Sequence, residues 1–312
     1  MRTMVFGGCG NVGSFVAAEL IEQGHEVCIF DQHPPSGVLS RYVRRLTFRK
    51  GDLTDPAQVL AAVAEQESEA VVLTAAMLAG GIAENPGSGM SLNIGGLLNV
   101  LSAAATLKVR RVVFSSTDAV AGETCLVRHE QAAIGPELSV YAASKLLGER
   151  LGLLFAHQHD FEFIALRYSL VFGPTPTRGA GIARIFRDIL DTVDGRDLKV
   201  SAFSGGWRQQ ITYVSDVAAA TCRALTHPKP SHTIYNVAGP YENFISMSEF
   251  CDVLKRMVPT AGTVEFSGPT RAEGLCDTSR IRGDLGFVPQ YGIERSIQAW
   301  LDERQHMSAA SV

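Results

Sequence analysis

A glycine-rich turn between an apolar run and an amphipathic segment constrains the fold of this chain more than any other feature. Residues 7–13, Gly-Gly-Cys-Gly-Asn-Val-Gly, directly follow the apolar run Thr3–Phe6 and lead into the helical pattern Val12–Gln23, which Gly24 closes. Glycines at such a turn allow a tight bend and a close approach of the backbone to a phosphate at the positive end of the helix. The arrangement therefore predicts the first strand and helix of a dinucleotide-binding βαβ unit.

Short apolar runs alternate with amphipathic stretches through the first half of the chain. The stretch Pro56–Glu65 follows Asp55, an N-cap residue type, and has proline at its first helical position. Because strands that alternate with helices build parallel sheets, we expect an α/β fold, namely a Rossmann-type doubly wound parallel sheet with a smaller α+β substrate-binding lobe. The expected strands are Thr3–Phe6, Glu26–Phe30, Leu46–Arg49, Ala70–Leu73, Arg111–Ser115 and Glu162–Arg167.

The alternation loosens after residue 168, where glycine and proline become frequent. We expect residues 169–208 and 239–312 to form the substrate-binding lobe. Residues 1–168 and 209–238 would form the NAD-binding domain, because a strand leading into a helix at Ile211–Ala220 and a strand at Thr233–Val237 are expected to return to it.

The charge of the chain excludes several classes of partner. It has 28 basic and 32 acidic residues and a net charge of -4, so it lacks the electrostatic footprint of a protein that binds nucleic acid or an anionic membrane surface. No apolar run reaches the length that spans a bilayer. Its 6 cysteines form no CxxC pair and its 8 histidines show no ligand spacing, so we expect no metal site and free thiols in the cytoplasm.

Acidic residues follow the second and third expected strands. Asp31 lies 18 residues after Gly13, where a carboxylate accepts hydrogen bonds from the adenosine ribose and repels a 2′-phosphate, so the sequence predicts NAD rather than NADP. Asp52 would either accept the adenine amino group or cap a helix. Spacing alone leaves both roles of Asp52 open.

Tyr141 and Lys145 are four residues apart, which places them on one face of a helix. A nearby ammonium, together with a positively charged nicotinamide, favours the phenolate, and lowering a tyrosine pKa from about 10 to about 7 requires roughly 4 kcal/mol. The segment 115–118, Ser-Ser-Thr-Asp, ends a strand and supplies a hydroxyl that can hold a substrate oxygen. The combination predicts acid–base chemistry on a hydroxyl-bearing carbon.

These motifs together resemble one family. The chain is similar to the extended short-chain dehydrogenase/reductases of the NAD-dependent epimerase/dehydratase family. The matching segments run nearly end to end and are the glycine turn at 7–13, Asp31, Gly51-Asp52-Leu53, Leu73–Ala76, Asn93, Ser115–Thr117, Tyr141 with Lys145, Arg167-Tyr168, Gly173-Pro174, Tyr213–Val217 and Tyr235–Val237.

The resemblance implies a role for individual residues and NAD as the cofactor. Tyr141 would be the general acid/base, Thr117 would position the reacting oxygen, and Lys145 would bind the nicotinamide ribose. Relatives often dimerise through helices that correspond here to regions within 93–105 and 141–155, so a homodimer is expected. The expected cofactor-binding residues are Gly7, Gly10, Asn11, Val12, Gly13, Asp31, Asp52, Leu53, Thr74, Ala75, Ala76, Asn93, Ser115, Tyr141, Lys145 and Tyr168.

Two departures from the family pattern bear on the reaction. Dehydratases carry a glutamate where this chain has Ala119, and nucleotide-sugar epimerases carry an asparagine where it has Leu170. Dehydration is therefore disfavoured, and a substrate diphosphate would lose a hydrogen-bond donor. Arg208 and Arg271 match positions where relatives bind nucleotide phosphates, but a surface or interlobe position explains each arginine equally well.

The segment around Met77 resembles family members that oxidise small hydroxy acids. We therefore expect NAD-dependent net oxidation of a small-molecule substrate, namely a sugar, polyol or small hydroxy acid. The alternative is a nucleotide-sugar 4-epimerase that retains its NAD, and an alternative of another class is a non-catalytic NAD(H)-sensing module, against which the intact catalytic residues argue. The candidate substrate-binding residues are Met77, Thr117, Asp118, Arg208 and Arg271.

Overall fold

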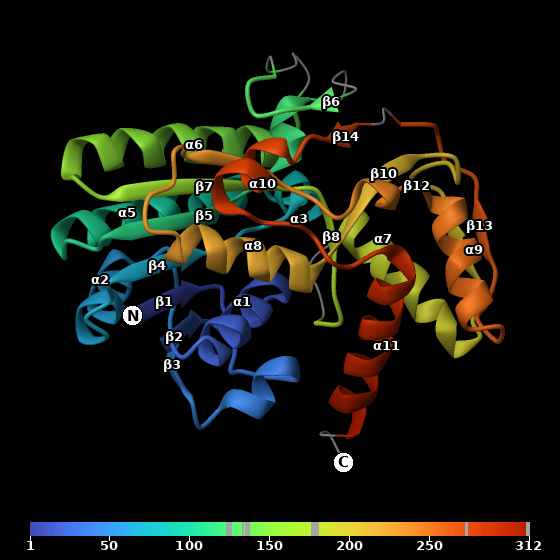
Figure 1. The fold of residues 1–312 in the computed structure, drawn as a ribbon, viewed down its shortest axis with the longest axis horizontal. Helices are drawn as coiled ribbons and strands as arrows, with labels where there is room; N and C mark the ends of the chain where they lie inside the picture. Colours follow the sequence, from blue (N-terminus) through green and yellow to red (C-terminus); the bar gives the residue numbers. More distant parts are fainter. Residues whose placement is uncertain (123–126, 133, 135–137, 176–180, 272–273, 310–312) are drawn as a thin grey trace.

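A seven-stranded parallel sheet forms the centre of the larger lobe (Figure 1). Its strand order is β11-β7-β5-β4-β1-β2-β3, so the chain runs outward from β1 first in one direction and then in the other. The strands are β1 (Arg2–Phe6), β2 (Glu26–Asp31), β3 (Leu46–Lys50), β4 (Ala70–Leu73), β5 (Arg111–Thr117), β7 (Glu162–Tyr168) and β11 (Ile234–Val237). The computed structural model describes residues 1–122, 127–132, 134, 138–175, 181–271 and 274–309.

Helices cover both faces of this sheet, which confirms the expected doubly wound α/β fold. α1 packs on α8 on one face, and α5 packs on α2 and α6 on the other. The apolar core under α1 and α8 continues into the smaller lobe, whereas the core under α2, α5 and α6 is separate. The helices of the larger lobe are α1 (Asn11–Glu22), α2 (Pro56–Glu65), α3 (Ala79–Glu84), α4 (Pro86–Met90), α5 (Gly96–Thr106), α6 (Val140–His159), α8 (Val214–Thr226) and α10 (Ser279–Leu285).

Local sequence explains where these elements begin and end. Asp55 caps α2 by accepting hydrogen bonds from two backbone N–H groups, and Ser139 caps α6 by accepting one. The six strands predicted from the alternation are all present, each within two residues of its expected ends. The largest difference is that β5 continues two residues further, to Thr117, and its residues are buried to that end.

The smaller lobe is built around a three-stranded sheet in the order β12-β10-β8. A single residue, Ser169, separates β7 from β8, so the chain passes almost directly from one sheet to the other. Two further strand pairs, β9 with β13 and β6 with β14, are parallel. The elements are β6 (Val127–Arg128), β8 (Leu170–Phe172), α7 (Ile182–Leu190), β9 (Leu198–Val200), β10 (Arg208–Tyr213), β12 (Phe244–Ser246), α9 (Met247–Met257), β13 (Val264–Phe266), β14 (Leu275–Cys276) and α11 (Ile293–Ala309).

The segment 209–238, which was expected to return to the larger lobe, has different partners along its length. Strand β10 pairs with β8 and β12, whereas α8 packs on α1 and β11 pairs with β7 at the edge of the large sheet. The physical reason is that β8 leaves the large sheet directly after β7 and offers β10 a parallel partner there, Leu170–Phe172 against Ile211–Tyr213. The lobe boundaries themselves stay a prediction.

The topology gathers polar residues at one edge of the large sheet. Asp31 ends β2, Thr117 ends β5 and Tyr168 ends β7, and all these strands are parallel. The strand order reverses at β1, between β2 and β4. Ligands of doubly wound sheets bind outside the carboxyl ends of the strands at such a reversal, so this edge is the place to look for a site.

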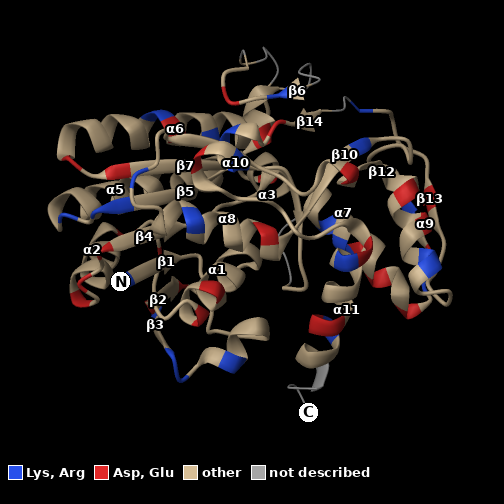
Figure 2. Ribbon diagram, in the orientation of Figure 1, with Lys and Arg blue, Asp and Glu red and all other residues tan. Residues whose placement is uncertain are grey.

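Basic and acidic residues are interspersed over the elements rather than gathered on one face (Figure 2). No helix in the part of the chain that the structure describes combines the length and apolarity needed to cross a bilayer.

Candidate active site

A cleft of about 670 Å³ runs along the carboxyl edge of the seven-stranded sheet and reaches the smaller lobe. The predicted site residues that line it are Gly7, Gly10, Asn11, Val12, Gly13, Asp31, Leu53, Thr74, Ala75, Ala76, Ser115, Thr117, Asp118, Tyr141, Lys145, Tyr168 and Arg271. Among the described residues, four predicted ones lie outside its lining, and these are Asp52, Met77, Asn93 and Arg208. The individual roles of all these residues stay predictions.

The glycine turn is packed too tightly for a side chain at two positions. A Cβ atom on Gly7, whose φ is +77°, would lie 2.5 Å from the backbone nitrogen of Ala75, and one on Gly13 would lie 2.2 Å from the carbonyl oxygen of Gly7. Helix α1 begins at Asn11, and its first N–H groups have no intrahelical partners. The buried Oδ1 atom of Asn11 also lacks a hydrogen-bond partner within the described residues. The positive end of a helix behind a glycine-rich turn fits a pyrophosphate.

The Asp31 carboxylate closes one side of this turn. Its Oδ2 atom accepts a hydrogen bond from the backbone N–H of Cys9, and its Oδ1 atom accepts one from the N–H of His33, both at 3.0 Å. All three residues line the cleft. The carboxylate thus lies where adenosine ribose hydroxyls are expected, and it would repel an added 2′-phosphate.

Asp52 stabilises a turn instead of facing the cleft. Its Oδ1 atom accepts hydrogen bonds from the backbone N–H and the hydroxyl of Thr54, both at 2.8 Å. The N-cap of α2 is Asp55, so Asp52 does not fill the helix-capping role that was considered for it. Gly51 and Leu53, on either side of Asp52, do line the cleft. The geometry therefore favours a turn-forming role for Asp52 over an adenine contact.

The Asn93 side chain forms hydrogen bonds to the backbone of Met77, and neither residue lines the cleft. The Asn93 side-chain amide accepts from the backbone N–H of Met77 (2.8 Å), donates to its carbonyl oxygen (3.1 Å) and donates to the Ser144 hydroxyl (3.1 Å). All of its side-chain polar atoms are thereby used. Asn93 holds the segment after Ala76 against α6, which explains its burial without a cofactor contact.

Helix α6 places Tyr141 and Lys145 beside the end of β5. The Lys145 side chain is buried, its Nζ atom donates to the carbonyl oxygen of Ser115 (2.7 Å), and the same atom lies 5.9 Å from the centre of the Tyr141 ring. Thr117, two residues further along β5, accepts a hydrogen bond from the N–H of Ala119 (3.3 Å) and so caps the short turn that follows. Phenol, ammonium and threonine hydroxyl meet at one end of the cleft.

Burial shifts the pKa values of Tyr141 and Lys145 in opposite directions. Partial burial raises the pKa of the Tyr141 phenol, and the nearby Asp118 carboxylate raises it further. Burial lowers the pKa of Lys145 to about 7, against the opposing effect of Glu149. The protein alone therefore does not lower the pKa of Tyr141 as expected from the sequence, and a positively charged nicotinamide would have to supply that effect.

Sequence reasoning missed Glu149, which lies on the same face of α6 one turn after Lys145. It accepts two hydrogen bonds from the Arg167 guanidinium (2.8 and 2.7 Å) and one from the Ser116 hydroxyl (2.6 Å), and it is fully buried. The spacing Tyr141, Lys145, Glu149 was the available signal, because residues four apart share a helix face. This contact fixes α6 to β5 and β7, the strands that carry the site.

The predicted substrate residues of the smaller lobe are placed differently from one another. Arg208 points to Glu249 (3.1 Å) and to the carbonyl oxygen of Phe244 (2.8 Å), outside the cleft lining. Arg271 lines the cleft and lies over the Trp207 ring, 5.9 Å from its centre. Tyr168 also lines it, although its hydroxyl bonds to Thr221 of α8 (2.8 Å).

Other lining residues were not predicted, and Arg128, Trp207 and Gln209 are among them. They lie in or beside β6 and β10, and β6 contains only two residues. A two-residue strand has no periodicity that a sequence can display. Asp118, which was predicted, forms an ion pair with Arg128 (2.6 Å).

Metal-ligating side chains are dispersed. No group of three or more histidine, cysteine or acidic residues that could hold a metal ion occurs in the described ranges. Cys28, Cys222, Cys251 and Cys276 are free thiols, and Cys125 lies outside the described residues.

Comparison with known proteins places this architecture among nicotinamide-dependent enzymes. The sequence description of the NAD dependent epimerase/dehydratase family matches residues 3–238. A UDP-glucuronate 4-epimerase from Thermodesulfobacterium geofontis is 27% identical over 310 residues, covering 95% of this chain and 93% of the relative.

Solved structures agree with this placement. A UDP-glucose 4-epimerase from Thermus thermophilus, in complex with NAD, is 26% identical with a TM-score of 0.86, covering 98% of this chain and 99% of that one. An L-threonine dehydrogenase from Cupriavidus necator is 23% identical with a TM-score of 0.84, covering 98% of this chain and 100% of that one, and shows the same fold.

Proposed function

Because the chain belongs to the NAD dependent epimerase/dehydratase family and is an NAD-dependent enzyme, we propose that it oxidises a hydroxyl-bearing carbon of a sugar, polyol or small hydroxy acid and releases the ketone. The observation that carries the proposal is the meeting of Tyr141, Lys145 and Thr117 at one end of the cleft. These side chains supply an acid/base, a cation and a hydroxyl around one reacting oxygen.

Each of the three has a distinct task. Tyr141 takes the proton from the substrate hydroxyl during oxidation and returns it in the reverse direction. Thr117 holds that oxygen beside the phenol. Lys145, fixed by its hydrogen bond to Ser115, stabilises the phenolate and binds ribose hydroxyls. The Lys145 side chain is 3% exposed, and this exclusion of water strengthens its charge interactions.

The other end of the cleft fits a dinucleotide. The glycine turn and the start of α1 would hold the pyrophosphate, and Asp31 the adenosine ribose. NAD, when bound, accepts the hydride from the carbon whose hydroxyl Tyr141 deprotonates. The chain contributes position and proton transfer to that step.

Net oxidation is favoured by the residues of the smaller lobe. Leu170 lines the cleft with an apolar side chain, and the Arg208 guanidinium is bound to Glu249 and Phe244 instead of facing the cleft. Of the two arginines considered for a diphosphate, only Arg271 lines the cleft. Nucleotide-sugar 4-epimerisation is the second candidate, because the curated relatives carry that name and Arg271 is in place.

The experiment that separates these reactions measures NADH released per substrate consumed, with panels of free sugars, polyols, hydroxy acids and UDP-sugars. Net oxidation gives one released NADH per ketone, whereas an epimerase converts substrate and releases none. Tyr141→Phe should keep NAD binding and lose turnover by about 100- to 10,000-fold. Substantial turnover by this variant would contradict the assigned role, and bound NAD that no compound reduces would support the non-catalytic NAD(H)-sensing alternative.

A homodimer through α6 forms part of the proposal. Val140, Leu147 and Leu154 are large apolar residues of α6 whose side chains are nearly half exposed, and they repeat every seven residues. That repeat equals about two helical turns, so the three form one stripe on the surface. Such a stripe is suited to a second copy of the same helix across a two-fold axis.

The cytoplasm is the proposed location of the enzyme. Cys28, Cys222, Cys251 and Cys276 are free thiols, which suits a reducing compartment. Cell fractionation followed by detection of the protein tests this placement.

A further inference from the structure

Asp118 and Arg128 form an ion pair inside the wall of the cleft. The Nη1 atom of Arg128 donates to the Oδ2 atom of Asp118 at 2.6 Å, and the two side chains are 9% and 10% exposed. Both residues line the cleft, and Asp118 directly follows Thr117. Neither partner is explained by the acid–base chemistry of Tyr141 and Lys145.

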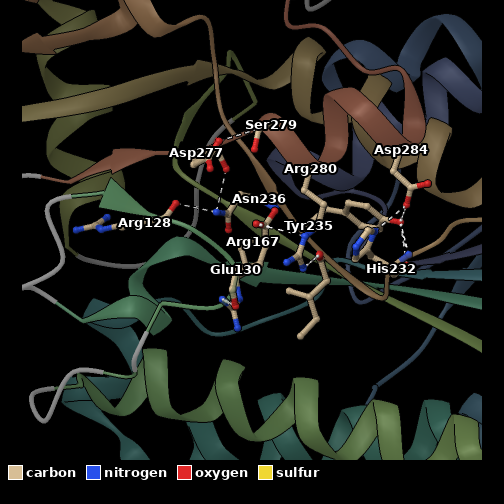
Figure 3. Close-up of polar contacts among 11 residues, drawn as sticks. Arg128, Glu130, Arg167, His232, Tyr235, Asn236, Asp277, Ser279, Arg280 and Asp284 are labelled. Atoms are coloured by element: carbon tan, nitrogen blue, oxygen red, sulfur yellow. Dashed lines mark hydrogen bonds and ion pairs between the residues drawn. The ribbon is translucent and has the colours of Figure 1, made fainter.

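Arg128 is held firmly in place from outside the cleft. Its strand β6 pairs with β14, and its carbonyl oxygen accepts hydrogen bonds from the N–H of Asp277 (2.8 Å) and from the Asn236 side chain (2.9 Å). Figure 3 shows the guanidinium directed away from this cluster. A Cβ atom on Gly274 would lie 2.4 Å from the Nε atom of Arg128, so the side chain fills space that only glycine leaves.

The second oxygen of the Asp118 carboxylate is left without a donor. Oδ2 is bound by Arg128, while Oδ1 has no hydrogen-bond partner among the residues that the structure describes. The Asp118 side chain is only 10% exposed, and a donor that reaches its second oxygen would stabilise the carboxylate. Because Asp118 lines the cleft, a bound substrate is in position to bring that donor.

The charges around Asp118 favour a neutral donor over an ammonium group. Arg128 already neutralises the carboxylate, and Lys145 adds a further positive charge at this end of the cleft. Among the described lining residues, the other carboxylate is Asp31, which lies at the glycine turn. A substrate ammonium would therefore add an unmatched charge, whereas a hydroxyl would not.

We propose that Asp118 accepts a hydrogen bond from a second substrate hydroxyl, on a carbon next to the one that is oxidised. This inference rests on the proposed function and names its substrate class, a vicinal diol. Thr117 and Asp118 are consecutive, with Cα atoms about 3.8 Å apart, and the short turn that Thr117 caps lets both line the cleft. Asp118 is then a specificity-determining residue, and Arg128 is a positioning residue that acts through it.

The test compares substrates that differ only at the neighbouring carbon. One set is 2,3-dihydroxybutyrate, 3-hydroxybutyrate and threonine, which carry a hydroxyl, a hydrogen and an ammonium there, and the other is UDP-glucose with its 3-deoxy analogue. Single-turnover reduction of enzyme-bound NAD is followed for each. In the wild type we expect a diol to react with a kcat/KM about 10- to 100-fold above its deoxy partner, the range for a hydrogen bond to a charged group.

The double variant Asp118→Ala/Arg128→Met removes both charges at once, so no buried charge is left unpaired. It should bring the ratio of diol to deoxy substrate to about 1 to 3. Asp188→Ala, which breaks an exposed ion pair with Arg184 on α7, is the matched control and should keep the wild-type ratio. A purely structural role of the pair would lower the rates of both substrates and leave their ratio unchanged.

A binding measurement supplies a readout independent of turnover. In the Tyr141→Phe background with NAD present, calorimetry should give a Kd for the diol about 10-fold or more below that of the deoxy compound, and the double variant should remove the difference. Equal affinities and rates for diol and deoxy compounds, or a preference for threonine, would overturn the diol assignment alone. A wild type that reduces NAD with none of these compounds would overturn the proposed function and this inference with it.

Discussion

Burial shifts the pKa of the Lys145 ammonium down and that of the Tyr141 phenol up. Burial disfavours the charged form of each group, so it works against the phenolate as well as against the ammonium. The spacing of the two residues was predictable from the sequence, since residues four apart share a helix face. Their electrostatics was not, because the depth of burial and the neighbouring Asp118 come from the fold.

The pKa of Lys145 predicts a pH dependence of stability. Its folded-state pKa is about 7, whereas a lysine in an unfolded chain titrates near about 10.4. Between these values the unfolded chain binds the extra proton, so the free energy of unfolding rises with pH, and the penalty is fully present below about pH 7. Denaturant unfolding of cofactor-stripped protein at about pH 7 and about pH 9 should show this rise in the wild type and a smaller one in Lys145→Met. Parallel curves for the two proteins would contradict it.

Asp31 predicts the choice of dinucleotide. Its carboxylate, held by the N–H groups of Cys9 and His33, would face the 2′ position of the adenosine ribose. Asp31→Ala should lower the ratio of kcat/KM for NAD to that for NADP by about 10-fold or more. Steady-state kinetics with both dinucleotides measures the ratio, and Asp52→Ala is a suitable comparison because the Asp52 carboxylate bonds to Thr54 within its own turn. An unchanged ratio in Asp31→Ala would count against the assignment.

Helix α6 combines two functions on different faces. One face carries Tyr141, Lys145 and Glu149 toward β5 and β7, and another exposes the apolar stripe of Leu147 and Leu154. Long elements such as this one were predictable because they display several turns of a period. The short strands of the smaller lobe, two to six residues long, show too little pattern, and Asn93 shows that a buried amide at a predicted position can serve the backbone instead.

The Glu149–Arg167 pair predicts a large stability loss when one partner is removed. Glu149→Gln leaves the buried Arg167 guanidinium without its counter-charge, so the free energy of unfolding should fall by about 3–5 kcal/mol. The control Asp188→Asn, in an exposed pair, should cost less than about 1 kcal/mol. Denaturant unfolding measures both, and Glu149→Leu/Arg167→Met, which removes both charges, should recover much of the loss. Equal effects of Glu149→Gln and Asp188→Asn would show that the pair does not stabilise the fold as described.

At the scale of the whole molecule, two sheets share one continuous stretch of chain. Ser169 lies between β7 and β8, and its hydroxyl bonds to Thr212 (2.6 Å) and to the carbonyl oxygen of Gln210 (2.9 Å). The central sheet and its helices were predictable from alternation, as was the edge used for the cleft. The pairing of β10 with β8 was not, because partner choice between two sheets depends on contacts between residues far apart in the chain.

The exposed stripe on α6 predicts the oligomeric state. Leu147→Glu/Leu154→Glu places two carboxylates in the proposed interface and should convert a dimer to a monomer, measured by analytical ultracentrifugation. Leu60→Glu, an exposed apolar position on α2, is the matched control and should leave the dimer intact. A monomeric wild type, or a double variant that sediments as the wild type does, would contradict the proposed interface.

The short ladder between β6 and β14 would let substitutions far from the catalytic residues change the substrate preference. It ties the position of Arg128 to Gly274 and Cys276, which come from the last part of the chain and lie outside the glycine turn and α6. A substitution in that late segment would tilt the arginine, and through it Asp118, while the dinucleotide end of the cleft stayed as it is. Related enzymes of this fold could therefore diverge in substrate preference through the residues that hold Arg128 and Asp118, while the residues of hydride transfer stay the same.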